Sequence, residues 1–421
     1  MQNNKTFTKD WKIEKLDNIF NFFGGTTPST SIKEFWNGDI SWVTPSDLNN
    51  YLQNIYLIKT EKKLTEVAVK KYSLNIFSEN NILLSTRASI GLVAINKLPV
   101  TINQGMTVLI PKNRNTISPS YFVYYFYWVK KYLNQLASGS TFKEISKSNL
   151  RNMNVYLPTL PEQKKIAEIL INIDKGIEEV SKAIEKTKNL KKGLMQKLLT
   201  KGIGHKEFKE TEIGKIPKEW KLEEMEEVVD INKEYIDPGR ELSNKKFFYI
   251  DIDSVENETG IIKNLKEIIG KEAPSRARRF VRYNDVIMST VRPYLKAFAI
   301  IPKLYDSQVC STGFAVLRCK SRILPKFLLY ILYSKPLVSQ FNRLMVGAHY
   351  PALNSSQVKK LKIYLPPISE QKKIAEILSI SDDRIQLLKE KKGKLERVKK
   401  GLMNELLTGK KRVKVDFKQG G

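Results

Sequence analysis

Asp251 and Asp253 are the residues whose types and spacing most directly suggest chemistry. They lie in the stretch "YIDIDSVE". In an extended segment, two carboxylates two positions apart face the same side and could bind a divalent cation. The corresponding stretch of the first half, "SWVTPSDL", has no such pair, and acidic residues on an exposed strand are more often simply solvated. We therefore predict no metal site, and a metal-dependent nuclease using these two residues is the enzyme alternative.

Other residue patterns that support catalysis are missing from the sequence. The chain has two histidines, His205 and His349, too few for most histidine-based metal or acid–base sites. It has no GxxxxGK[ST] phosphate loop, no GxGxxG, no HExxH and no Asp/Asn-Pro-Pro-aromatic motif of amino-methyltransferases. Its two cysteines, Cys310 and Cys319, form neither a disulfide framework nor a zinc-ribbon spacing. The sequence predicts a chain that is not itself an enzyme.

The charge balance predicts a polyanionic partner. Lys and Arg number 72 against 44 Asp and Glu, which gives a formal net charge of +28. Nucleic acid is the commoner reason for such a surplus, and a Lys-rich host proteome is the alternative. The N-terminal residues lack the apolar core of a signal peptide, and no stretch is apolar enough to cross a membrane. We expect a cytoplasmic protein with no membrane partner.

An internal repeat organises the chain. "EQKKIAEIL" occurs at 162–170 and again, 208 positions later, at 370–378. The same shift aligns "KKGLMQKLLT" with "KKGLMNELLT", "NVYLP" with "KIYLP", and "INQGMTVLIPKN" with "CSTGFAVLRCKS". A period this long indicates a duplicated domain rather than a solenoid. Each repeat has a variable block followed by a near-constant block.

The variable and constant blocks predict different structures. Short β-branched runs such as "NNILLST", "GLVAIN" and "GMTVLIPK" are typical of strands, and the aromatic run 119–138 of a buried helix, so each variable block is predicted to be α+β. Its counterpart, 325–345, contains Pro336, which breaks or kinks a helix. Each constant block carries an apolar stripe at steps of three and four, typical of a coiled coil. Thr187 and Lys191 interrupt the first stripe, as Ser381 and Lys392 interrupt the second.

The motifs resemble a known family. "LPxxxEQKKIAEIL" followed by a helix ending in "KKGLMxxLLT", present twice after two dissimilar domains, resembles the specificity subunit of a type I restriction–modification system. The resemblance implies an α+β fold with two globular target-recognition domains in tandem. Two long helices would separate them, packing as an antiparallel coiled coil with pseudo-two-fold symmetry. The expected ranges are 1–158 for the first domain, 159–203 for the first spacer helix, 204–366 for the second domain, and 367–421 for the second helix and a basic tail.

The resemblance also implies partners. Each recognition domain would read one half of a bipartite, asymmetric sequence in double-stranded DNA. The helices would bind two modification (methyltransferase) subunits, and restriction/translocase subunits would join the complex. No cofactor is expected in this chain, because S-adenosylmethionine, ATP and Mg²⁺ would be bound by the partner subunits. A stand-alone sequence-specific DNA-binding regulator is the alternative, and it would not require a helix surface repeated twice.

Candidate DNA contacts are polar residues in loops that follow predicted strands or helices, because base edges and phosphates are read by such donors and acceptors. In the first domain they are Thr86, Arg87, Ser89, Gln104, Ser140, Thr141 and Lys143. In the second domain the loop candidates are Arg292, Tyr294, His349 and Tyr350. The run Arg276, Arg278, Arg279 and Arg282 is interpreted as a segment that contacts phosphates or inserts into a groove. For any single Arg or Lys, a solvated surface charge is the alternative.

The repeated helix motif supplies the candidate partner surface. Packing within a coiled coil does not require identical residues off the apolar stripe, whereas a partner that docks twice does. The predicted partner-binding residues are Glu162, Gln163, Lys164, Lys165 and Glu168, with Glu370, Gln371, Lys372, Lys373 and Glu376. A recent duplication would also explain the identity.

Overall fold

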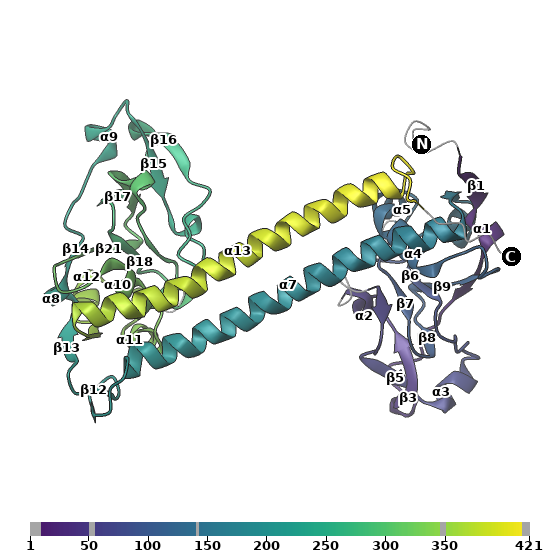
Figure 1. Ribbon diagram of the computed structural model, residues 1–421, viewed down its shortest axis with the longest axis horizontal. Coiled ribbons are helices and arrows are strands. Elements are labelled where there is room, and N and C mark those ends of the chain that lie inside the picture. The colour runs from purple at the N-terminus through teal and green to yellow at the C-terminus, as the bar shows by residue number, and fades with distance from the viewer. Residues whose placement is uncertain (1–9, 50–54, 140–142, 346–350, 415–421) are drawn as a thin grey trace. The chain divides into compact units, whose positions relative to one another are not determined.

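The protein divides into two compact units that together contain mixed α and β structure (Figure 1). The computed structural model describes residues 10–49, 55–139, 143–345 and 351–414. Unit 1 comprises residues 1–184 and 388–421, and unit 2 comprises residues 185–387. The chain is therefore α+β, as predicted, and each of the two longest helices contributes residues to both units.

Unit 1 contains a five-stranded sheet, in the order β2-β9-β6-β7-β4, and a three-stranded sheet, β5-β3-β8. A separate pair, β1-β10, joins the two ends of the variable block. The strands are β1 (Lys12–Lys15), β2 (Phe20–Gly24), β3 (Trp36–Val43), β4 (Tyr56–Leu57), β5 (Lys62–Leu64), β6 (Ile82–Ser85), β7 (Val93–Asn96), β8 (Val100–Ile102), β9 (Met106–Pro111) and β10 (Asn154–Leu157). The three predicted runs named above form β6, β7 and β9.

The helices of unit 1 surround this framework. They are α1 (Leu16–Ile19), α2 (Pro45–Asn49), α3 (Glu66–Lys71), α4 (Pro119–Trp128), α5 (Lys130–Gln135), α6 (Lys147–Arg151) and the first part of α7 (Leu160–Lys201), with the 3-10 turn Lys33–Phe35. The predicted aromatic helix is therefore two helices, separated at Val129. Tyr121, Phe122, Tyr125 and Phe126 of α4 are buried in the main core, as predicted.

Unit 2 repeats part of this topology. Its sheet β14-β21-β18-β19 has the strand order of β2-β9-β6-β7, and its pair β13-β22 corresponds to β1-β10. A second four-stranded sheet, β16-β15-β20-β17, and the pair β11-β12 complete it. The strands are β11 (Phe208–Lys209), β12 (Ile216–Pro217), β13 (Lys221–Glu224), β14 (Val229–Ile231), β15 (Lys246–Ile250), β16 (Lys266–Ile269), β17 (Ala277–Val281), β18 (Val286–Ser289), β19 (Phe298–Ile300), β20 (Gln308–Ser311), β21 (Phe314–Cys319) and β22 (Lys362–Leu365).

The predicted helix 325–345 of unit 2 is divided near Pro336, as expected. Helix α10 (Pro325–Leu332) stops before Pro336, and α11 (Lys335–Leu344) starts with that proline in its first turn, where a missing N–H is tolerated. The others are α8 (Met225–Val228), α9 (Pro238–Glu241), α12 (Ser355–Lys359), the start of α13 (Ile368–Leu406) and 3-10 turns at Ile252–Ser254, Gly270–Glu272, Pro293–Leu295 and Lys303–Tyr305.

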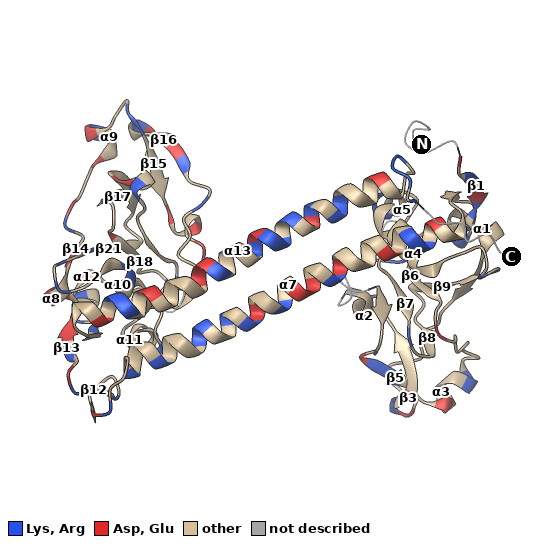
Figure 2. Ribbon diagram, in the orientation of Figure 1, with Lys and Arg blue, Asp and Glu red and all other residues tan. Residues whose placement is uncertain are grey.

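The main core of each unit includes residues of the long helices. In unit 1, Ile166 and Leu170 of α7 and Leu406 of α13 pack with the aromatic side chains of α4. In unit 2, Leu198 of α7 and Ile374 of α13 pack with the corresponding core. The stripe is interrupted, because Leu190 is 60% exposed and Val398 is 50% exposed. Figure 2 shows acidic and basic residues interspersed along both helices.

Among the residues that the structure describes, no helix is both long enough and apolar enough to cross a membrane.

Candidate nucleic-acid interface

Three loops of unit 1 meet beyond the end of β6. The Thr86 N–H donates to the Gly105 carbonyl at 2.9 Å, and the Ile145 N–H donates to the Thr86 carbonyl at 2.9 Å. The Ala88 N–H donates to the Lys143 carbonyl at 3.0 Å. The structure therefore brings together the segments 86–89, 103–105 and 143–147, which contain five of the predicted DNA contacts.

The side chains of these predicted contacts differ in accessibility. Thr86 is buried, with its hydroxyl 3.5 Å from the Gly105 carbonyl oxygen. The Arg87 Nε lies 3.8 Å from a carboxylate oxygen of Glu144, and both side chains are partly exposed. Ser89, Gln104 and Lys143 are exposed. Ser140 and Thr141 lie outside the described residues.

A hollow of about 240 Å³ opens among the same loops. Its apolar lining consists of Phe22, Met106, Ile145 and Leu150, and Gly24 and Gly25 also line it. Its polar lining consists of Thr86, Gln104, Thr107, Glu144, Ser146 and Lys147. A side chain at position 25 would clash, because a Cβ there would lie 2.1 Å from the Ile102 carbonyl oxygen. Thr86 and Gln104 are among the contacts predicted from the sequence, whereas Glu144 and Lys147 are not.

The matching loop of unit 2 has the same backbone contacts. The Thr290 N–H donates to the Gly313 carbonyl at 2.8 Å, and the Arg292 N–H donates to the Pro351 carbonyl at 2.8 Å. Arg292 has a φ of 47° and Ala88 a φ of 59°, so these two residues occupy equivalent left-handed positions. Tyr294 is exposed in the following 3-10 turn. His349 and Tyr350 lie outside the described residues.

The four arginines lie on β17 or next to its ends, and two of them form ion pairs with acidic side chains. Arg278 forms an ion pair with Asp237 at 2.9 Å, and Arg282 forms one with Glu234 at 3.0 Å. Arg276 is exposed at the start of the strand. The buried Nε of Arg279 has no hydrogen-bond partner among the described residues. The predicted contact segment is therefore a sheet strand, paired with β20.

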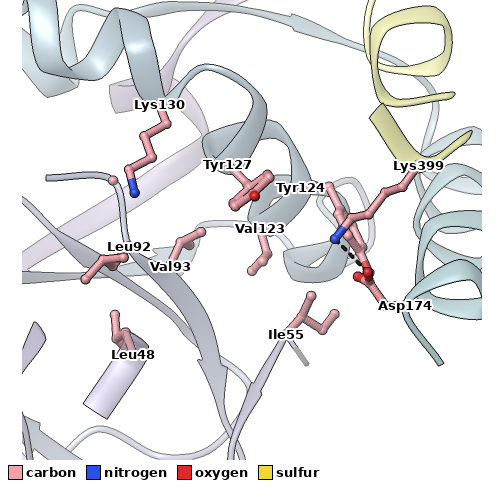
Figure 3. Close-up of a pocket in the computed structure, with 11 residues that line it drawn as sticks. Leu48, Ile55, Leu92, Val93, Val123, Tyr124, Tyr127, Lys130, Asp174 and Lys399 are labelled. Atoms are coloured by element: carbon pink, nitrogen blue, oxygen red, sulfur yellow. Dashed lines mark hydrogen bonds and ion pairs between the residues drawn. The ribbon is translucent and has the colours of Figure 1, made fainter. Parts of the chain in front are cut away.

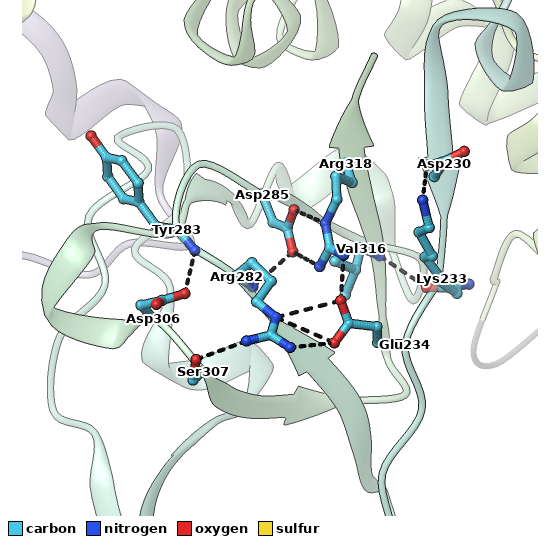
Figure 4. A network of polar contacts seen from close by, with 11 residues as sticks. Asp230, Lys233, Glu234, Arg282, Tyr283, Asp285, Asp306, Ser307, Val316 and Arg318 are labelled. Atoms are coloured by element: carbon cyan, nitrogen blue, oxygen red, sulfur yellow. Dashed lines mark hydrogen bonds and ion pairs between the residues drawn. The ribbon is translucent and has the colours of Figure 1, made fainter.

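Arg282 belongs to a larger polar network, drawn in Figure 4. Its Nη1 donates to Ser307 Oγ at 3.2 Å, and its backbone N–H donates to Asp285 at 2.8 Å. Arg318 binds both Asp285, through two hydrogen bonds of 2.8 Å, and Glu234. Hydrogen bonds from Arg282 and Arg318 hold the pKa of Glu234 below its usual value. The network fixes the backbone between β17 and β18.

The two aspartates at the end of β15 do not form the pair that the sequence suggested. Asp251 accepts hydrogen bonds from the Ser254 N–H at 2.9 Å and the Ser254 hydroxyl at 2.6 Å. It thereby caps a 3-10 turn that contains Asp253, so the two residues do not share one side of a strand. The expectation of an extended segment is wrong here, because the cap bends the chain. Within the described part of the chain, no cluster of three or more His, Cys, Asp or Glu side chains could hold a metal ion.

The predicted partner surface divides into buried and exposed residues. Gln163 is fully buried, where its amide oxygen accepts from the Ser118 N–H and its amide nitrogen donates to the Thr116 and Pro158 carbonyls. Gln371 makes the corresponding three hydrogen bonds in unit 2, with the Leu324 N–H and the Arg322 and Pro366 carbonyls. The repeat of these glutamines therefore has an explanation inside each unit.

The glutamates beside them are also engaged within their units. Glu162 is 1% exposed and accepts from the Trp11 indole at 3.2 Å and from Arg412. Glu370 accepts from the Trp220 indole at 2.9 Å and contacts His205 Nε2 at 2.9 Å. The exposed residues of the predicted surface are Lys164, Lys165, Glu168, Lys372, Lys373 and Glu376.

A Tyr–Asp–Lys cluster connects each variable block to both long helices, α7 and α13. In unit 1, the Tyr124 hydroxyl donates to Asp174 at 2.7 Å, and Lys399 Nζ lies 2.6 Å from the same carboxylate (Figure 3). In unit 2, Tyr330 donates to Asp382 at 2.8 Å, and Lys191 lies 2.5 Å from it. Burial and the neighbouring aspartate raise the pKa of both tyrosines, which keeps their hydroxyls protonated as donors.

Comparison with known proteins relates the whole chain to one family. Residues 8–188 and 217–397 each match the family described as the type I restriction modification DNA specificity domain. The putative type I restriction enzyme MjaX specificity subunit of Methanocaldococcus jannaschii is 30% identical, over 96% of this chain and 95% of that protein. The MjaIX specificity subunit of the same organism is 37% identical, over 56% of this chain and 55% of that protein.

Solved structures share the fold at lower identity. The type I restriction–modification S subunit from M. genitalium matches 96% of this chain and 98% of its own, with a TM-score of 0.57 and 16% identity. A chain from a structure on complex assembly and conformational transition of the type I system matches 96% of this chain and 99% of its own, with a TM-score of 0.56 and 16% identity. Two family matches that together cover most of the residues establish the relationship. The chain belongs to the family of type I restriction–modification DNA specificity domains, and it carries that domain twice.

Proposed function

We propose that this chain is the sequence-recognition subunit of a type I restriction–modification complex, and that each recognition domain, 1–158 and 204–366, reads one half of a bipartite, asymmetric DNA target. The observation that carries the proposal is the double match to the family domain, once in each half of the chain. The net charge of +28 supports a DNA partner. The family assignment favours this function over the alternative of a stand-alone regulator.

The proposed DNA contacts are the single residues predicted from the sequence. In the first domain they are Thr86, Arg87, Ser89, Gln104, Ser140, Thr141 and Lys143. In the second they are Arg276, Arg278, Arg279, Arg282, Arg292, Tyr294, His349 and Tyr350. The meeting of three loops around Thr86 supports the first set, because it gathers exposed polar side chains on a backbone fixed by hydrogen bonds. For Arg278 and Arg282, contact with phosphate would compete with Asp237 and Glu234. Their contribution to affinity is therefore expected to be smaller than that of Arg276.

We further propose that segments 159–203 and 367–421 act as an antiparallel coiled coil that spaces the two domains with pseudo-two-fold symmetry. Contacts within unit 1 support the antiparallel direction, since Glu162 pairs with Arg412 and Asp174 with Lys399. Contacts within unit 2 follow the same order, with Lys191 on Asp382 and Ile203 on Glu370.

The proposed partners are two modification subunits, which would bind S-adenosylmethionine, and restriction subunits, which would bind ATP and Mg²⁺. The exposed, repeated residues Lys164, Lys165 and Glu168, with Lys372, Lys373 and Glu376, support a docking surface that occurs twice. Charge reversal of Lys164 and Lys165 to Glu is expected to weaken co-purification with the modification subunit and to reduce methylation. Circular dichroism of the variant should match that of the wild type.

The proposal is tested by footprinting the complex, reconstituted from the purified chain and its modification subunits, on DNA from its host. Protection of two short segments separated by an unprotected spacer supports it. Protection of one continuous segment by the chain alone, unchanged when the partners are added, would instead establish the regulator.

A further inference from the structure

The same backbone frame carries different side chains in the two units. An isolated antiparallel bridge joins Arg87 to Glu144 in unit 1, and the corresponding bridge in unit 2 joins Val291 to Ala352. The flanking hydrogen bonds agree, because the Ile145 N–H donates to Thr86 and the Leu353 N–H donates to Thr290, both at 2.9 Å. The bridge therefore forms with a charged pair or with an apolar pair.

The differences extend to the other polar residues around the hollow of unit 1. Under the 208-residue shift, Gln104 corresponds to Thr312 and Lys147 to Ser355. Helices α6 and α12, which start at Lys147 and Ser355, are both capped by the preceding side chain, so the position is structurally equivalent. The long polar side chains around the hollow of unit 1 are thus replaced by shorter side chains at the corresponding positions of unit 2, while the backbone hydrogen bonds are the same. Such a pattern fits residues that select a ligand rather than residues that hold the fold.

The hollow has the composition of a site for a planar, polar-edged group. Its lining is partly apolar, and within the described part of the chain the Thr86 and Thr107 hydroxyls make hydrogen bonds of 3.5 Å, to the Gly105 carbonyl, and 3.4 Å, to each other. Gln104 and Glu144 supply polar groups that are exposed to solvent. An apolar surface with a few convergent polar groups is typical of specific ligand sites.

The polar residues that line the hollow suit some chemical groups of DNA better than others. A carboxylate accepts hydrogen bonds and repels phosphate, so Glu144 suits a donor such as the exocyclic amine of cytosine, and Gln104 suits adenine. The Arg87 Nε lies 3.8 Å from a carboxylate oxygen of Glu144 and limits the orientation of that carboxylate. A phosphate would be attracted by Lys147 but repelled by Glu144.

We propose that this hollow is a base-recognition subsite of the first domain, in which Glu144, oriented by Arg87 and assisted by Gln104, accepts a hydrogen bond from the exocyclic amine of cytosine or adenine. The inference rests on the proposed function and deepens it, because it names a specificity-determining residue and the chemical group that it reads. The second domain has Ala352 at this position and reads its half-site without such a contact.

The variant Glu144→Gln tests the subsite, because it replaces an acceptor-only group by one that also donates. Modified-base mapping is carried out in the host with the variant gene in place of the wild-type gene. The expected result is that methylation extends to sites in which one position of the first half carries guanine or thymine, which present a carbonyl oxygen in the major groove, in place of cytosine or adenine, which present an amine there. Discrimination at that position should fall about tenfold or more. The second half should be unchanged.

The double variant Arg87→Val/Glu144→Ala is expected to fold, because unit 2 forms the corresponding bridge with a valine and an alanine, Val291 and Ala352. It is expected to accept any base at the same single position. The matched control is Glu66→Gln, an exposed residue of α3 whose side chain is 81% accessible, which should leave the whole motif unchanged.

Two results would overturn the subsite. One is a motif that stays the same at every position in both variants. The other is uniform loss of methylation by a variant whose melting temperature matches the wild type, which would make Glu144 a general affinity residue. Failure of the proposed function is a separate outcome, since then deletion of the gene would leave the host methylation pattern as it was.

Discussion

At the scale of single residues, Gln163 and Gln371 explain why part of the helix motif is repeated. Each amide links the start of a long helix to the loop before α4 or α10, because it makes three hydrogen bonds to backbone groups there. Backbone groups buried without a partner are costly, so the chain needs an amide at both positions. Identity between repeats at these sites follows from folding and does not require a partner.

Replacing Gln163 by Ala should destabilise unit 1. The change leaves the Ser118 N–H and the Thr116 and Pro158 carbonyls without this partner, and each buried unsatisfied group costs about 1–3 kcal/mol. We expect the free energy of unfolding to fall by at least about 2 kcal/mol in urea denaturation. The neighbouring exposed Lys164→Ala should change it by less than about 0.5 kcal/mol. Equal effects of the two variants would refute the assignment.

Glu234 should make unit 2 sensitive to acid. Hydrogen bonds from Arg282 and then Arg318 lower the pKa of Glu234 from its usual 4.5. The unfolded chain therefore takes up a proton first as pH falls, and stability that is present above about pH 4.5 is lost as pH drops through the lower folded pKa.

Thermal melts of wild type and Glu234→Gln between pH 6 and pH 3 test this expectation. The variant should melt at a lower temperature near pH 6, and the difference should shrink toward pH 3. Glu210→Gln, at an exposed position of unit 2, is the control and should follow the wild type at every pH. A difference that grows as pH falls would contradict the sign of the pKa shift.

At the scale of secondary-structure elements, each Tyr–Asp–Lys cluster connects one variable block to both α7 and α13. Asp174 lies on α7, Lys399 on α13 and Tyr124 on α4, and unit 2 uses Asp382, Lys191 and Tyr330 in the same way. In both units the lysine comes from the long helix of the other repeat. Neither variable block is therefore packed against its own helix alone.

Lys399→Met should destabilise unit 1 strongly. Asp174 is 9% exposed and would lose its cation, and breaking a buried ion pair costs about 3–5 kcal/mol. The double variant Asp174→Asn/Lys399→Met should recover part of that loss, because it removes the uncompensated charge. Lys400→Met, at the exposed neighbouring position, is the control. Calorimetry of the wild type, Asp174→Asn, Lys399→Met and the double variant measures the coupling, and strictly additive effects would show that the pair is not coupled.

The sequence predicted the elements better than their contacts. The apolar stripe of the first constant block predicted a long helix, which the structure places at Leu160–Lys201. Lys191 appeared to interrupt the apolar stripe, whereas its charge pairs with Asp382. Periodicity identifies the inward face of a helix but not the residue that faces it from 191 positions away. For the same reason, the inward role of Glu162, which contacts Trp11 and Arg412, could not be predicted.

Within the candidate interface, the sequence indicated local features such as loops but not contacts between segments that are far apart along the chain. The loop after β6 was identified because a buried strand ends there beside glycine and polar residues. The partners of Arg278 and Arg282 were missed, because Asp237 and Glu234 belong to a segment about 40 residues earlier that folds back onto β17. Glu144 was missed because its significance depends on the bridge to Arg87.

At the scale of the whole molecule, we predict that each of the two domains can be exchanged without changing the DNA sequence that the other recognises. Replacing residues 1–158 by the corresponding domain of another family member should change one half of the methylated motif and leave the other half as it was. The new half should be the same in any recipient chain, because the proposed contacts of each domain lie within that domain. Methylome mapping of the exchange strain measures this outcome, and a change in both halves would contradict it.

The central claim is that this chain selects the DNA sequence at which a partner methylates adenine. The most direct test is modified-base mapping by long-read sequencing of the host genome, with the gene intact and with the gene deleted. We predict that deletion abolishes adenine methylation at one split, asymmetric motif and leaves other modified motifs unchanged. A host that expresses the complex and keeps the same methylated motifs after deletion would contradict it.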